Sequence, residues 1–127
     1  VEPADPVVYG PMFFRRPREG FAPKSILQTE GLMDRFTPPR GMESLAGAAG
    51  IPIVEPVHAP IDALALRGID PVGAPVSGNV AGGEATAGLL QFPEQGHFAI
   101  FRDPGAGASA AELLRSTADG TPRIVAP

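Results

Sequence analysis

Two side chains suited to acid–base chemistry, Asp34 and His97, each follow a short apolar segment and precede a segment with helical character. Histidine takes up and returns a proton near neutral pH. A carboxylate that accepts a hydrogen bond from the imidazole orients the ring and stabilises the cation that forms when the ring takes a proton. The pair therefore suits nucleophilic or general acid–base catalysis, although a lone histidine after a glycine is more often a surface or capping residue.

The elements that must position this pair are two strands of a parallel sheet. Residues 88–92 form a nearly continuous apolar run, which is typical of a strand buried on both faces, and residues 25–29 form a second strand candidate. The carboxyl ends of neighbouring parallel strands meet at one edge of the sheet, where open α/β proteins place their chemistry. We therefore expect an α/β fold in which Asp34 and His97 lie on the same rim.

Two helices are expected to follow these strands. Thr37 is a candidate N-cap before Pro38, apolar residues then recur at helical spacing, and Gly50 is a candidate left-handed C-cap. Residues 109–112 have the Ser and Glu spacing of a capping box, which predicts the start of the second helix. The Gly-Ala-Gly at 105–107 is accordingly expected to be a loop before that helix rather than a phosphate-binding motif.

Composition narrows the class of protein. The 127 residues are 43% apolar, enough for one domain with a core. The 16 glycines and 16 prolines predict long irregular connections, mainly within residues 1–25 and in an insertion or loop at about 55–87. A net charge of −4 argues against a nucleic-acid partner, and no apolar run is long enough to cross a membrane. Without cysteine, disulfides and thiolate chemistry are excluded.

Two other interpretations of the charged and metal-ligating residues, a metal site and a glycosidase, find little support. His58 and His97 lack the spacing of metal ligands, so we expect neither a metal nor a cofactor. Glu30 and Asp34 are expected in a loop rather than on one helical face, which disfavours a paired-carboxylate glycosidase. The sequence starts at Val1 without a methionine or a signal-like segment, and we expect a processed product or part of a longer protein.

Two segments resemble the C-terminal part of an α/β-hydrolase of the esterase and lipase kind. Residues 26–39, Ile-Leu-Gln-Thr-Glu-Gly-Leu-Met-Asp-Arg-Phe-Thr-Pro-Pro, resemble the strand and loop that carry the triad acid. Gly96-His97-Phe98, after an apolar strand, resembles the loop that carries the triad base. The resemblance implies that Asp34 is the acid and His97 the base of a Ser–His–Asp triad.

The nucleophile of that triad is not evident in the sequence. No serine has the Gly-x-Ser-x-Gly frame of a nucleophile elbow. Two or three short parallel strands also need more sheet and more helices than this chain offers. We therefore expect a missing N-terminal piece of the same hydrolase to carry the serine and the oxyanion hole. The serines without the frame are Ser25, Ser44, Ser77, Ser109 and Ser116.

The resemblance implies a carboxylic ester hydrolase, with this chain as the C-terminal portion of a mostly parallel sheet flanked by helices. Leu32, Met33 and Phe98 neighbour the acid and the base and are expected either to line an apolar acyl pocket or to pack in the core. Two alternatives stay open: a serine peptidase of the prolyl oligopeptidase type, and a non-catalytic Pro/Gly-rich binding or cell-envelope module in which Asp34 caps a helix. The compartment is open, with a secreted or cell-envelope location slightly favoured.

Overall fold

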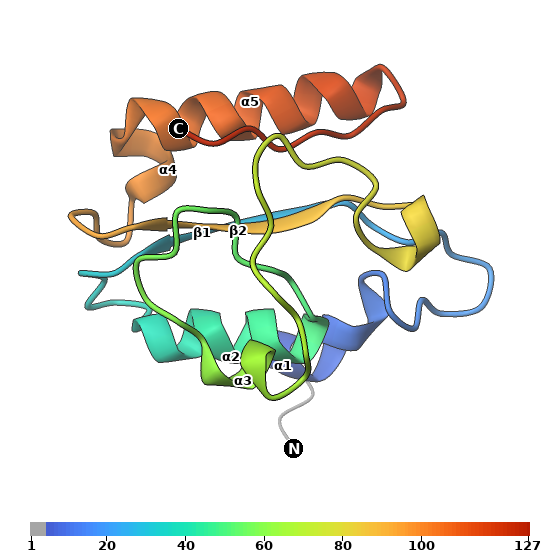
Figure 1. Ribbon diagram of the computed structural model, residues 1–127, viewed down its shortest axis with the longest axis horizontal. Helices are drawn as coiled ribbons and strands as arrows, with labels where there is room; N and C mark the ends of the chain where they lie inside the picture. Colours follow the sequence, from blue (N-terminus) through green and yellow to red (C-terminus); the bar gives the residue numbers. More distant parts are fainter. Residues whose placement is uncertain (1–4) are drawn as a thin grey trace.

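The fold is α/β, with a small parallel sheet between helices on both faces (Figure 1). The computed structural model describes residues 5–127, so the predicted processed start at Val1 lies outside the described residues. The strands are β1 (Ile26–Gly31) and β2 (Ala87–Phe92). The predicted α/β class agrees with this arrangement, and membership of a larger hydrolase sheet remains a prediction. Helices α4 (Ala99–Arg102) and α5 (Pro104–Ala118) cover one face, and α1 (Pro6–Tyr9), α2 (Pro39–Ala49) and α3 (Asp62–Ala65) lie on the other (Figure 1).

The two strands pair in parallel, as predicted, with Glu30 directly opposite Gln91. All six residues of β2 are buried, in keeping with its apolar run. Strand β1 continues to Gly31 rather than ending at Thr29, so the expected loop position of Glu30 is wrong. The reason is a tertiary contact, because Gln91 of the neighbouring strand supplies a hydrogen bond to the Glu30 carboxylate.

Side chains of β2 alternate between two cores, one on each face of the sheet. Ala87 and Leu89 pack with residues of α2 and α3, whereas Leu90 and Phe92 pack with α5 and the C-terminal segment. Full burial of a large aliphatic or aromatic side chain contributes about 1.5–3 kcal/mol, so the cores on the two faces hold the helices onto the strands.

Helix α2 begins at Pro39, one residue later than the sequence predicts, and Pro38 is its N-cap. Pro38 is extended, with φ −56° and ψ 144°, because a residue that precedes a proline avoids the helical region. The predicted capping role of Thr37 is therefore wrong, and its backbone N–H instead donates to Asp34 over 3.0 Å. Gly50 ends the helix with φ 82°, as predicted.

Helix α5 begins at Pro104, so the capping box predicted at 109–112 and the loop predicted at 105–107 are both wrong. Asp103 is the N-cap, and its carboxylate accepts hydrogen bonds of 2.9 and 3.1 Å from two backbone N–H groups of the first turn. A proline at the first helical position has no N–H that needs an acceptor. Asp103 and Pro104 together therefore leave few backbone N–H groups of the first turn without a partner. Ser109 lies inside the helix and is fully buried.

The remaining segments combine short helices with irregular chain. Residues 6–12 form α1 and a 3-10 turn where an irregular loop was expected, because the Asp5 carboxylate accepts a hydrogen bond of 2.9 Å from the Val7 N–H. No helix within the described residues 5–127 has both the length and the apolar composition of a membrane span. Segment 55–87 is mostly irregular, yet it supplies Ile61, Leu64, Val76 and Ala85 to the two cores.

Candidate active site

Asp34 lies in the loop between β1 and α2, and the backbone of that loop fixes its carboxylate. Oδ1 accepts hydrogen bonds from the backbone N–H groups of Phe36 at 2.8 Å and Thr37 at 3.0 Å. Aspartate favours such turns because its short side chain reaches the backbone two or three residues ahead. The side chain is only 9% exposed, and its second oxygen, Oδ2, faces His97.

His97 lies on the turn between β2 and α4 and pairs with Asp34. Its Nδ1 is 3.0 Å from Asp34 Oδ2, so the two residues meet on one rim of the sheet, as expected. When Nδ1–H donates to the carboxylate, Nε2 of the neutral ring carries the lone pair that can accept a proton. The imidazole is 38% exposed. An acid and a base are thus in hydrogen-bonding contact, with the basic nitrogen left for a third group.

Close backbone contact holds the two loops in this relationship. The N–H of Met33 donates to the carbonyl oxygen of Gln95 over 2.9 Å. A Cβ at Gly31 would lie 2.7 Å from that same carbonyl oxygen and nearer still to the carbonyl oxygen of Gly96. Glycine at position 31 therefore permits the approach that places His97 beside Asp34.

The surroundings lower the pKa of Asp34 below its ordinary value of 3.8. Partial burial by itself would raise this pKa, but hydrogen bonds from the N–H groups of Thr37 and Phe36, and then the hydrogen bond and charge of His97, outweigh it. The carboxylate is consequently ionised at neutral pH. In that state it can stabilise an imidazolium at His97.

His97 also lines a cavity of about 170 Å³ at the rim of the sheet. The rings of Phe36 and Phe98 flank the imidazole, with centroid distances of 5.5 and 4.9 Å. The surroundings of the base are therefore apolar on two sides, while the cavity itself has mixed character. Its lining residues are Thr29, Gly31, Asp34, Thr37, Met42, Gly96, His97 and Ala99.

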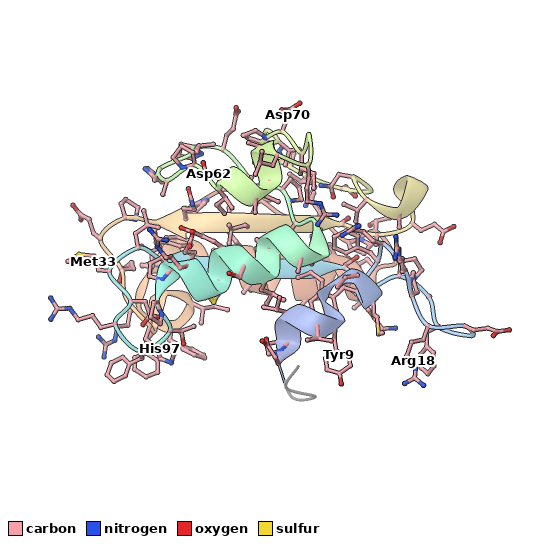
Figure 2. The ribbon with its side chains drawn as sticks, turned by 90° about the horizontal axis from the view of Figure 1, so that it is seen from below. Tyr9, Arg18, Met33, Asp62, Asp70 and His97 are labelled. Atoms are coloured by element: carbon pink, nitrogen blue, oxygen red, sulfur yellow. The ribbon has the colours of Figure 1, made fainter. Side chains whose placement is uncertain are left out.

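The three residues expected to form an apolar pocket do not line this cavity. Leu32 is half-buried, and Met33 is 62% exposed and lies apart from His97 in Figure 2. Phe98 is half-exposed and touches the imidazole edge-on. Met42 of α2 provides apolar lining instead. Sequence reasoning missed Met42 because its position on a helical face does not tell which strand end that face approaches.

No serine hydroxyl in residues 5–127 contacts His97. The hydroxyl that does is Thr37 Oγ1, 3.4 Å from Nδ1, the nitrogen already bound to Asp34. A nucleophile must approach Nε2, so the described part of the chain provides an acid and a base and no nucleophile. The serines bond elsewhere: Ser25 to Thr86, Ser44 to Arg40, Ser77 to Pro122, Ser109 to Gly105 and Val125, and Ser116 to Glu112, Leu113 and Arg123.

The other residues considered for chemistry lie outside this site. His58 is exposed, and its backbone N–H donates to Gln91 over 3.0 Å. The Glu30 carboxylate accepts a hydrogen bond from Gln91 of the neighbouring strand β2 and does not contact Asp34. Between residues 5 and 127, no three histidine, aspartate or glutamate side chains are grouped so as to hold a metal ion.

Comparisons of this chain with protein-family models, with curated proteins and with solved structures find no match. The function is accordingly inferred from the geometry around Asp34 and His97.

Proposed function

We propose that this chain supplies the acid and the base of a Ser–His–Asp carboxylic ester hydrolase, and that a companion polypeptide segment supplies the serine. The observation that carries the proposal is the fixed pair: Asp34 Oδ2 lies 3.0 Å from His97 Nδ1, and Oδ1 is bound by two backbone N–H groups. Such a carboxylate sets the orientation and tautomer of the ring, which leaves Nε2 as the base. A capping aspartate by itself would not need a histidine partner.

In the reaction, the serine oxygen attacks the ester carbonyl carbon while His97 Nε2 takes the serine proton. Asp34 stabilises the resulting imidazolium. Collapse of the tetrahedral intermediate breaks the ester C–O bond, and His97 returns the proton to the leaving alcohol. Water then attacks the acyl-enzyme with the same general base, which releases the acid and restores the serine. The oxyanion-hole donors come from the companion in this proposal.

The surroundings of His97 favour an ester with a small apolar acyl or alcohol group. Phe36 and Phe98 flank the ring, and Met42 lines the adjoining cavity of about 170 Å³. A cavity of this size accommodates only a few carbon atoms. Short-chain esters are therefore the proposed substrates, and Leu32 and Met33 as substrate contacts stay a prediction.

The test uses the complex isolated from its source cells through a tag on this chain. We expect hydrolysis of a p-nitrophenyl ester, a loss of about 10⁴-fold in kcat with His97→Ala, and a similar loss with Asp34→Asn. His58→Ala is the matched control, because His58 is exposed and bonds through its backbone. Full activity of the His97→Ala complex would overturn the proposal.

A serine-reactive fluorophosphonate locates the nucleophile in the same sample. Intact-mass measurement should find the label on the companion and none on the 127-residue chain. A label on this chain would contradict the division of the triad. Faster cleavage of a proline-containing peptide amide than of the ester would favour the peptidase alternative.

A further inference from the structure

Among residues 5–127, strand β1 is paired along one edge only. The N–H of Ile26 donates to the carbonyl of Thr86, and the N–H of Leu32 donates to the carbonyl of Phe92, both on the β2 side. Backbone groups alternate in direction along a strand, so those of the residues at positions 27 and 29 point away from β2. Within the described residues, no group forms a hydrogen bond with them.

Strand β2, in contrast, has neighbours on both edges. On the side away from β1, Leu89 donates to the carbonyl of Pro52 and accepts from the N–H of Val54, each over 2.8 Å. Helices already cover both faces of the sheet (Figure 1). Of the two edges of the β1–β2 pair, only the outer edge of β1 lacks backbone partners among the described residues, and we call it the open edge.

The open edge borders the candidate active site. Thr29, whose backbone belongs to the open edge, lines the same cavity as Asp34 and His97. In Figure 2, His97 and Tyr9 lie on one side of the strands, and Asp62 and Asp70 lie on the other. Although His97 follows β2, its side chain thus reaches past the end of β1 to the open-edge side.

Exposed apolar groups accompany the open edge. Beside His97, Phe36 is 82% exposed and Phe98 is 46% exposed. Large exposed rings next to unpaired backbone groups are typical of a surface that another polypeptide covers.

We propose that the open edge binds a parallel strand of the companion polypeptide and that this strand carries the nucleophilic serine to His97 Nε2. The inference rests on the proposed function and specifies where the companion binds. A parallel strand ends at the same rim as β1 and β2, so a serine just after it arrives beside the cavity. Strand addition satisfies the backbone groups of Leu27 and Thr29.

A second copy of this chain fits the open edge less well. Two β1 edges related by a two-fold axis pair in antiparallel fashion, so the two Asp34–His97 pairs lie at opposite ends of the joined strands. Of the five serines, Ser25 comes nearest to the other copy's rim, because it directly precedes β1, but its Oγ accepts a hydrogen bond from the Thr86 N–H and is thereby held on the β2 side. The companion must therefore be a different segment.

Cross-linking tests the proposal in the source cells. A photo-reactive amino acid replaces Thr29, or Leu114 as a control that is 73% exposed on α5. After irradiation, a biotinylated fluorophosphonate labels activated serines. We expect an adduct from position 29 and none from position 114, with the label on the partner and the cross-link in the segment just before the labelled serine.

The other outcomes separate the two proposals. If the protein that cross-links to position 29 carries no fluorophosphonate label, the proposed hydrolase function is overturned. The proposal that the docked strand carries the nucleophilic serine is then overturned as well. A labelled companion that co-purifies without an adduct at position 29 would overturn the docking site and leave the hydrolase function intact. An adduct with a second copy of this chain would also overturn the docking site.

A backbone variant provides an independent test. Thr29→Pro removes an N–H that points away from β2, a position where an edge strand tolerates proline. We expect recovery of the labelled companion to fall by at least about tenfold, equivalent to 1.4 kcal/mol of binding, with Thr29→Pro and to be unchanged with Leu114→Ala on α5. Equal recovery with a folded Thr29→Pro variant, checked by circular dichroism, would overturn the proposal. If this variant does not fold, the cross-link decides.

Discussion

Glu30 Oε2 accepts a hydrogen bond of 2.9 Å from Gln91 Nε2, and the two residues are direct neighbours across β1 and β2. The Gln91 amide also binds the backbone of His58 and Ala59, which ties segment 55–87 to the strand ends. Glu30 is 1% exposed, and its second oxygen has no partner among the described residues. A buried carboxyl group therefore stands beneath the rim that carries Asp34.

Burial raises the pKa of Glu30 above its ordinary value of 4.5, against the opposing effect of the Gln91 hydrogen bond, and the charge of Glu43 raises it further. The folded chain then holds this proton more tightly than the unfolded chain. The associated stability is present in full below pH 4.5 and is lost as the pH rises through the raised pKa. Its size is about 1.4 kcal/mol for each unit of the shift.

Glu30→Gln should therefore remove this part of the pH dependence, because the amide cannot ionise yet still accepts from Gln91. We expect the wild-type free energy of unfolding to decline relative to that of Glu30→Gln between pH 4 and pH 8, measured by urea denaturation. Glu84→Gln, at an exposed position, is the matched control. Parallel curves for wild type and Glu30→Gln would refute the shift.

Gly31→Ala should destabilise the fold by about 2–3 kcal/mol, since the new Cβ would overlap carbonyl oxygens of the loop before His97. Gly41→Ala is the matched control, because a Cβ in the first turn of α2 meets nothing within 4 Å. That change should stabilise by about 0.5–1 kcal/mol. Urea unfolding measures both, and similar effects of the two changes would contradict the close packing at Gly31.

Asp34→Asn should change the tautomer of His97. The carboxylate only accepts hydrogen bonds and so favours Nδ1–H, whereas an amide can donate and favours Nε2–H. ¹⁵N chemical shifts of the imidazole, measured on the labelled chain, distinguish the two forms. Asp70→Asn, at an exposed aspartate, should leave the ring unchanged. An unaltered tautomer in Asp34→Asn would show that Asp34 does not determine which nitrogen of the His97 ring carries the proton.

The same carboxylate gives a pH dependence of opposite sign to that of Glu30. Because the pKa of Asp34 is lowered, its stabilising effect is present above pH 3.8 and is lost as the pH falls through the lowered pKa. Urea denaturation should therefore show wild type more stable than Asp34→Asn at pH 6, with the difference shrinking toward pH 2. A difference that grows on acidification would contradict the lowered pKa.

Glu112 ties α5 to the C-terminal segment through Arg115 and Arg123. Their hydrogen bonds lower the pKa of Glu112 from 4.5 to about 2. We expect Glu112→Gln to lower Tm by roughly 2–4 °C at pH 7, with the difference lost as the pH falls from 4.5 toward 2. Glu19→Gln, at an exposed site, is the control. An undiminished difference at pH 2 would refute the coupling.

The sequence alone predicted the features that depend on local pattern. The apolar run of β2, the strand before Asp34 and the left-handed end of α2 at Gly50 all follow from hydrophobic periodicity and glycine conformation. The meeting of Asp34 with His97 also followed, because neighbouring parallel strands bring their carboxyl ends to one rim.

Only the tertiary structure decided the features that depend on partners distant in the chain. Glu30 is a buried strand residue because Gln91, 61 positions away, donates a hydrogen bond to its carboxylate. The open edge of β1 depends on which strand lies beside which, and no local pattern carries that information. The local spacing of apolar and polar residues determines which segments form strands and helices. The burial of a particular side chain and the pairing of strands depend instead on contacts that form only when the chain has folded.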